Sequence, residues 1–264
     1  MRLFQVDAFT DTPFKGNPAA VCLLDTPQPD DWLQAVAGEM NLSETAFLRP
    51  RGDRYELRWF TPTMEVELCG HATLASAHVL WETGACRADR AVAFETRSGT
   101  LRARRAGDWI ELDFPATPER EASCNIDLER ALGAAPAYVG KSKFDFLVEM
   151  AGEQAVRDLA PDLVLLQQAQ ARGVIVTARA DGGDHDFVSR FFAPQSGVPE
   201  DPVTGSAHCC LAPFWGRRLG KQEMVGFQAS ARGGIVRVRL QNDRVTLGGR
   251  AVTVLDAGLR CGGR

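Results

Sequence analysis

The sequence lacks the features of several protein classes. No apolar run approaches the roughly 20 residues that span a membrane, and the opening residues, MRLFQVDAFTDTPF, have one Arg and no apolar core like that of a signal peptide. Seven scattered cysteines form no CxxC pair, which predicts reduced, mostly buried thiols rather than a disulfide framework or a zinc site. We therefore expect a cytoplasmic protein that is not bound to a membrane.

Motifs for cofactors, metals and nucleic acids are also missing. There is no P-loop, no GxSxG elbow and no GxGxxG after a strand, and the four histidines form no HExxH, so neither a cofactor nor a metal is expected. With 30 Lys and Arg against 34 Asp and Glu, the net charge of −4 gives no attraction for nucleic acid. We therefore expect acid/base catalysis by side chains.

The length and the pattern of the chain predict two domains built from short strands and few helices. A chain of 264 residues with 45% apolar side chains suits two domains of about 130 residues each. Helices are expected at 31–40, capped by Asp30 or Asp31, at 70–83 and at 205–218. Strands are expected at 3–9, 19–24, 45–49, 55–60, 91–95, 100–104, 109–114, 235–240, 244–247 and 251–255.

The two halves of the sequence resemble each other. Phe60-Thr61-Pro62 precedes Gly70 and an apolar helix, and about half a chain length later Phe192-Ala193-Pro194 precedes Gly205 and another. The segments 94–101 and 227–235 match at a similar offset. Three matches in order predict a duplicated domain, with a cleft onto which both helix N-termini would open. We expect domains at 1–118 and 119–264, with the C-terminal strand a candidate to return to the first.

Several polar residues could act in such a cleft, and each also has a structural explanation. The free N–H groups of a helix that begins at Gly70 or Gly205 could bind an anion, but Asp201, Thr204 and Ser206 could simply cap the second helix. Glu44 could be a solvated strand-edge residue, or in a closed cleft it could shuttle a proton with a raised pKa. His71 could be a packed histidine, and Asp201 a turn residue before proline.

Six motifs in order resemble the phenazine biosynthesis-like, or PhzF-like, family. They are 4–10 (FQVDAFT), 14–21 (FKGNPAAV), 40–47 (MNLSETAF), 59–62 (WFTP), 67–73 (ELCGHAT) and 201–208 (DPVTGSAH). The resemblance implies an α+β, diaminopimelate epimerase-like fold. In that fold two pseudo-symmetric domains each wrap a β-sheet or barrel around a central helix, and the active site lies between them. The helices at Gly70 and Gly205 would be the central ones.

The resemblance also implies a function and a set of site residues. It implies a cofactor-independent isomerase that shifts a proton on a small carboxylate, since the founding member isomerises a dihydro-hydroxy-anthranilate. Glu44 would carry the proton, and His71 and Asp201 would hold polar groups of the substrate. The carboxylate would bind at Gly70, Gly205 and Ser206, with Asn17 nearby. A homodimer is also implied.

Two other functions remain open. Cys69 occupies the place of the first of two catalytic cysteines in related racemases, which suggests an amino-acid racemase or epimerase. The matching place in the second half holds Asp201-Pro202, and Cys209 and Cys210 are displaced from it. A non-catalytic small-molecule binding protein is the third possibility. The segment 230–234 (SARGG) differs from the Gly-Arg-Pro pattern of the phenazine enzyme, and 119–172 carries no marker specific to it, so the substrate stays open.

Overall fold

The computed structural model describes residues 1–260, which divide into two compact units. The first unit is Met1–Asp113 together with the C-terminal segment that begins at Gly248, and the second is Phe114–Leu247. The first boundary thus falls a few residues before 118, and the C-terminal strand packs with the first unit.

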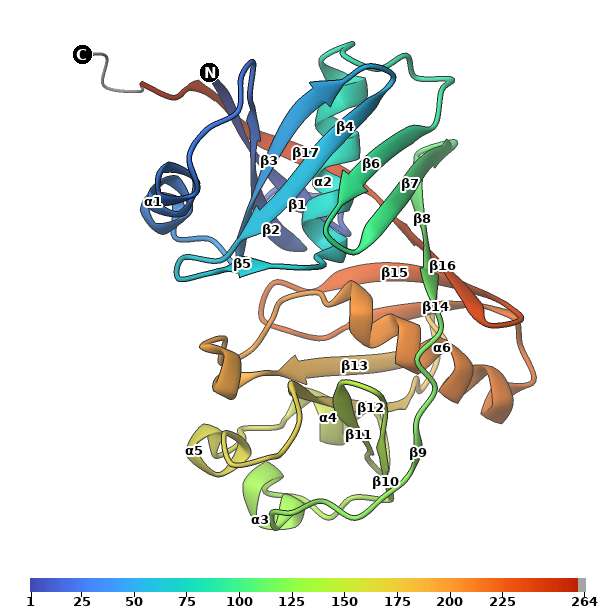
Figure 1. Ribbon diagram of the computed structural model, residues 1–264. Helices are drawn as coiled ribbons and strands as arrows, with labels where there is room; N and C mark the ends of the chain where they lie inside the picture. Colours follow the sequence, from blue (N-terminus) through green and yellow to red (C-terminus); the bar gives the residue numbers. More distant parts are fainter. Residues whose placement is uncertain (261–264) are drawn as a thin grey trace. The chain divides into compact units, whose positions relative to one another are not determined.

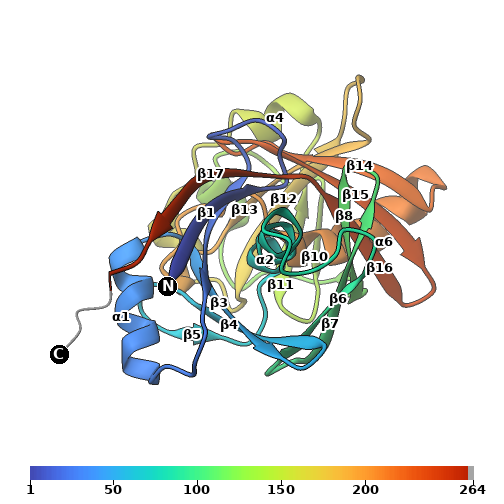
Figure 2. The same ribbon diagram turned by 90° about the horizontal axis from the view of Figure 1, so that it is seen from above.

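The first unit is a sheet around a buried helix. Its strands run in the order β17 (Ala251–Gly258), β1 (Arg2–Ala8), β2 (Asn17–Leu23), β3 (Glu44–Arg51), β4 (Arg54–Phe60), β6 (Val92–Thr96), β7 (Gly99–Ala106) and β8 (Trp109–Pro115). The short β5 (Glu65–Val66) pairs with β4. Helix α2 (Gly70–Glu82) contacts strands β1, β2, β3, β7 and β17. Figure 2 looks down α2, with strands of this unit around it.

The composition of α2 explains its place in the core. Residues 71–77 and 79–81 are all buried, and they are mostly Ala, Leu, Val and Trp. A helix that is apolar on every side is stable only when it is enclosed on every side. Its two buried hydroxyl groups keep hydrogen-bond partners within the segment, which offsets the cost of burying them. Thr73 donates to the Cys69 carbonyl, and Ser76 donates to the Ala72 carbonyl.

The second unit repeats this plan. Its strands run in the order β9 (Arg120–Glu121), β10 (Tyr138–Lys141), β11 (Asp145–Glu149), β12 (Gly173–Arg179), β13 (Phe187–Phe192), β14 (Glu223–Gln228) and β15 (Gly234–Gln241). Helix α6 (Gly205–Leu219) contacts β14 and β15, and Figure 1 shows it in orange beside strands of its unit. β16 (Arg244–Gly249) leads back to the first unit.

Strand directions confirm the duplication. From β2 through β3, β4 and β6 to β7, successive pairings are parallel, antiparallel, parallel and antiparallel. From β11 through β12, β13 and β14 to β15 the same sequence of directions recurs. Helix α2 lies in the chain between β4 and β6, and α6 lies between β13 and β14. Both helices therefore occupy the same step of one repeated topology.

One expectation from the sequence needs correction. Neither Asp30 nor Asp31 caps α1 (Asp30–Met40), because extended Pro29 takes the N-cap position and its carbonyl accepts from Leu33 N–H. The two acidic residues lie in the first turn, where their negative charges interact favourably with the positive end of the helix dipole. The segment 119–172, for which the sequence analysis gave no element bounds, forms α3 (Leu128–Leu132), α4 (Glu153–Arg157) and α5 (Leu163–Leu166) beside β9, β10 and β11. A short 3-10 helix, η1 (Pro194–Ser196), follows β13.

The cysteines are as predicted wherever the structure describes them. Among residues 1–260 the cysteines form no disulfide bond: Cys22, Cys69, Cys209 and Cys210 are buried thiols, and Cys86 and Cys124 are half-buried thiols. Cys261 lies outside the described residues. Among residues 1–260, none of the helices has the length and apolar character that crossing a membrane requires.

Glycine 249 tests how tightly α2 is enclosed. A Cβ at Gly249 would lie 2.5 Å from Phe9 Cδ1 and 2.6 Å from Leu74 Cδ1, whereas one at Gly258 would meet none of residues 1–260 within 4 Å. We expect Gly249→Ala to lower the free energy of unfolding by about 1–3 kcal/mol, as overpacked cores do. Urea unfolding of both alanine variants measures this, and equal stability of the two would contradict the packing described here.

Candidate active site

The residues predicted in the first half of the chain meet at the N-terminus of α2. Asn17 begins β2 and Glu44 begins β3, and these strands pair in parallel with Ala19 opposite Glu44. Cys69 is the N-cap residue of α2, and His71 is in its first turn. The parallel pairing brings two strand starts to one edge, and the buried helix brings its first turn to the same place. Gly70, predicted to bind an anion, is the first residue of this helix.

His71 is the centre of this group, and its surroundings keep it uncharged. Its side chain is 5% exposed, and burial lowers the pKa of His71 from 6.5 to about 3. The Asn17 side-chain nitrogen lies 3.3 Å from His71 Nδ1, and the Cys69 Sγ lies 3.5 Å from the same atom. An amide nitrogen can only donate, so Nδ1 accepts and the proton of the neutral ring is on Nε2.

This nitrogen is close to the Glu44 carboxylate. His71 Nε2 lies 3.3 Å from Glu44 Oε2, and the Glu44 side chain is 19% exposed. Glu44 is therefore largely enclosed beside an uncharged imidazole. A carboxylate in this position can accept a proton from a carbon acid and return it.

The same three side chains are also a possible metal set. Within residues 1–260, Glu44, Cys69 and His71 each offer a ligand atom within 4.8 Å of the others. Carboxylate, thiolate and imidazole are ligands that zinc accepts. An ion bound to Glu44 would withdraw that carboxylate from proton transfer, so the two uses of the group exclude each other.

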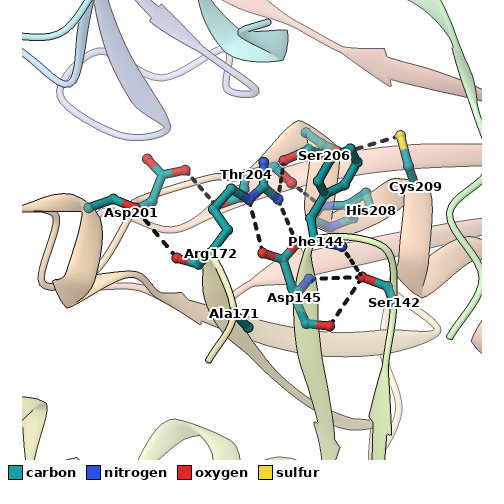
Figure 3. A network of polar contacts seen from close by, with 12 residues as sticks. Ser142, Phe144, Asp145, Ala171, Arg172, Asp201, Thr204, Ser206, His208 and Cys209 are labelled. Atoms are coloured by element: carbon teal, nitrogen blue, oxygen red, sulfur yellow. Dashed lines mark hydrogen bonds and ion pairs between the residues drawn. The ribbon is translucent and has the colours of Figure 1, made fainter. Parts of the chain in front are cut away.

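The predicted residues of the second half meet at the N-terminus of α6. Asp201 Oδ2 accepts a hydrogen bond of 2.5 Å from the Thr204 hydroxyl, and Thr204 is the N-cap residue of α6 (Figure 3). The side chain of Thr204 makes no capping bond to the helix, so the expected simple cap is not formed. Gly205 is the first residue of the helix, and Ser206 is the second. Each half of the chain thus assembles its own predicted group.

The residues that hold this second group in place were not predicted from the sequence. Gln228 is fully buried at the end of β14, where its Nε2 donates to the Asp201 carbonyl at 2.7 Å and its Oε1 accepts from Thr204 N–H at 2.8 Å. Arg172 donates to Ser206 Oγ at 3.0 Å. Gln228 and Arg172 are 24 to 34 residues from their partners along the chain. No local motif marks contacts of that range.

Residues 6–257 match the sequence model of the phenazine biosynthesis-like protein family. The chain belongs to this family. A relative named an uncharacterized isomerase, from Halalkalibacterium halodurans, is 54% identical over 258 residues, which are 97% of each chain. Another protein with that description, from Pseudomonas aeruginosa, is 49% identical over 260 residues, which are 98% of each chain.

Solved structures agree with this assignment. A crystal structure of a PhzF-family phenazine biosynthesis protein from Enterococcus faecalis matches with a TM-score of 0.93 and 39% identity, over 98% of this chain and 99% of that one. A probable proline racemase from Agrobacterium radiobacter has a TM-score of 0.69 at 12% identity, over 98% of this chain and 92% of that one, which shows a shared fold alone. The α+β, diaminopimelate epimerase-like fold is therefore confirmed, and by its family the chain is an isomerase.

The buried His208, beside the second group, makes the stability of the folded protein depend on pH. Burial lowers the pKa of His208 from 6.5 to about 4, against the opposing effect of its bond to the Thr204 carbonyl. Between these two pKa values the unfolded chain binds a proton that the folded protein does not. The free energy of unfolding therefore falls as the pH is lowered, by up to about 1.4 kcal/mol per pH unit. His208→Gln lacks this contribution, and we expect its stability deficit to narrow from pH 7 to pH 4. Urea unfolding across this range measures the deficit, and a constant deficit would contradict a neutral His208.

Proposed function

We propose that this member of the phenazine biosynthesis-like family is a cofactor-independent isomerase in which Glu44 moves a proton between two carbons of a small carboxylate. The observation that carries the proposal is the place of Glu44: it is largely enclosed, 3.3 Å from the Nε2 of an uncharged imidazole. A partly buried carboxylate beside a neutral donor suits a base that must become an acid within one turnover.

The reaction needs no atom from outside. Glu44 as carboxylate takes a proton from one carbon, and the electron pair of that C–H bond moves into the π-system of the substrate. The resulting carboxylic acid returns the proton to a second carbon, the double bond shifts, and Glu44 is a carboxylate again. A donated hydrogen bond from His71 Nε2–H would stabilise the charged form of Glu44 at the start and at the end. Asn17 fixes the tautomer that makes this donation possible.

The residues of the second unit would bind the substrate in this proposal. Ser206 has a hydroxyl that can donate to a carboxylate oxygen, and Asp201 has a carboxylate that can accept from an amino or hydroxyl group. The N–H groups of the first turns of α2 and α6, at Gly70 and Gly205, add donors for developing negative charge. The proposal includes a homodimer, as the family resemblance implies, and a location in the cytoplasm, a reducing compartment that suits the reduced thiols expected from the sequence.

Replacement of Glu44 tests the proposal. The enzyme is incubated in heavy water with a panel of small carboxylates that includes dihydro-hydroxy-anthranilate and common amino acids, and proton NMR follows deuterium entry at carbon. We expect Glu44→Gln to lower exchange by at least about a hundredfold, the contribution typical of a positioned acid/base group, while folding is retained. Glu39→Gln, on the exposed face of α1, is the matched control and should exchange normally. Normal exchange by Glu44→Gln would contradict the proposal.

An amino-acid racemase or epimerase is the second candidate, and one contact favours it. Cys69 Sγ lies 3.5 Å from His71 Nδ1, so a second acid/base group is next to the imidazole. A racemase would need this thiol to exchange the Cα hydrogen from the opposite face of the substrate. In the isomerase that we propose, Cys69 serves packing alone.

Replacement of Cys69 separates the two candidates. We expect Cys69→Ser to keep exchange within about threefold of the unmodified enzyme, because Glu44 carries the proton. Cys22→Ser, which changes a buried thiol on β2, is the control for general effects of burying a hydroxyl. Loss of Cα exchange in Cys69→Ser alone would favour the racemase.

A further inference from the structure

A buried ion pair in the second unit holds Arg172 in one place. Asp145 begins β11 and its side chain is 2% exposed, while Arg172 directly precedes β12. Arg172 Nε donates to Asp145 Oδ1 at 2.9 Å and Nη2 donates to Oδ2 at 2.5 Å, which is the two-point geometry that only arginine offers a carboxylate (Figure 3). The main chain is fixed as well, because Arg172 N–H donates to the Phe144 carbonyl at 2.8 Å.

Aromatic rings restrict the guanidinium further. The Cζ atom of Arg172 lies 5.3 Å from the ring centroid of Phe144 and 5.6 Å from that of Phe191. A cation over an aromatic face is attracted by the ring, and the contacts add to the restraint that Asp145 imposes. Gly173 makes room for this arrangement, since a Cβ there would lie 2.3 Å from Phe191 Cζ.

The restrained guanidinium of Arg172 also contacts Ser206. Nη2 donates to Ser206 Oγ at 3.0 Å, and this bond occupies an acceptor site of the hydroxyl. The Ser206 proton is then left to donate to something else. Within the part of the chain that the structure describes, Nη1 has no hydrogen-bond partner, and 39% of the Arg172 side chain is exposed. Two kinds of unused donor are therefore adjacent: an N–H edge and an O–H.

We propose that Arg172, anchored by Asp145, forms with Ser206 a subsite for one carboxylate group of the substrate. The inference rests on the proposed role of Ser206 and adds a residue to it. Nη1–H and the Ser206 hydroxyl suit the two oxygens of a single carboxylate, and the positive charge is fixed before the ligand arrives. An ion pair that served stability alone would not need a third bond to a hydroxyl at a helix start. The subsite selects acids over their neutral amides.

The test measures that selection directly. Isothermal titration calorimetry gives the dissociation constants of benzoate, anthranilate and cyclohexanecarboxylate, each against its amide. We expect the unmodified protein to prefer the acid, and Arg172→Gln to lower the acid-to-amide ratio about 10- to 100-fold, the loss typical of a hydrogen bond to a charged group. Arg172→Lys should keep part of the preference, because it keeps the charge without the planar edge.

Two further variants separate binding from stability. Arg172→Gln leaves Asp145 buried without its cation, so the double variant Asp145→Asn, Arg172→Gln removes both charges, and it should lose the preference while it stays folded. Arg130→Gln changes an exposed arginine of α3 in the same unit and should keep the full preference.

The outcomes distinguish this inference from the proposed function. A protein that binds none of the three acids better than its amide, or a preference that survives Arg172→Gln, would overturn the subsite. If the preference depends on Arg172 but Glu44→Gln still exchanges deuterium normally, the subsite stands and the proton-transfer role of Glu44 fails. If the preference is independent of Arg172 but exchange depends on Glu44, the subsite fails and the proton-transfer role of Glu44 stands.

Discussion

The contact between Glu44 and an uncharged His71 is the interaction on which the proposed chemistry depends. A charged imidazole would bind the carboxylate tightly and hold it as a weak base. A neutral imidazole 3.3 Å from the carboxylate leaves Glu44 able to change its charge. Burial supplies the neutrality, since it lowers the pKa of His71 to about 3, and Asn17 supplies the tautomer.

Burial of His71 follows in turn from the fold of the first unit. Helix α2 is enclosed by strands because its side chains are apolar on every face, and its first turn is therefore inside the protein. A polar side chain in that turn must find partners there, and Glu44, Asn17 and Cys69 provide them. The requirement for a stable core and the requirement for a functional group are met by the same helix start.

The second unit uses the same topology with different chemistry. The start of α6 has an Asp201–Thr204–Gln228 cluster and the Arg172–Ser206 contact in place of the pair of imidazole and carboxylate at the start of α2. His208, one turn further on, is neutral and bonded to the Thr204 carbonyl. Duplication of one fold has thus given two helix starts that have diverged, one toward proton transfer and one toward anion binding in our account.

Much of this could be predicted from the sequence, because the relevant residues lie in compact motifs. The motif 67–73 places Cys69, Gly70 and His71 at a helix start, and 201–208 does the same for Asp201, Gly205 and Ser206, so each group was found within its own half. The small strands and helices between 119 and 172 were missed, because short elements carry little periodicity. Arg172, Asp145 and Gln228 were missed because their partners are 24 to 34 residues away, a separation that only the folded sheet closes.

Long-range nitrogen–proton NMR of selectively labelled histidine tests the central claim most directly. The nitrogen shifts of His71, assigned by comparison with a His71→Gln spectrum, report both the charge and the tautomer of its ring. The account predicts a neutral ring with the proton on Nε2 from pH 8 down to about pH 4, since burial lowers the pKa of His71 to about 3. A ring that gains its second proton near pH 6.5, or that carries its single proton on Nδ1, would contradict it.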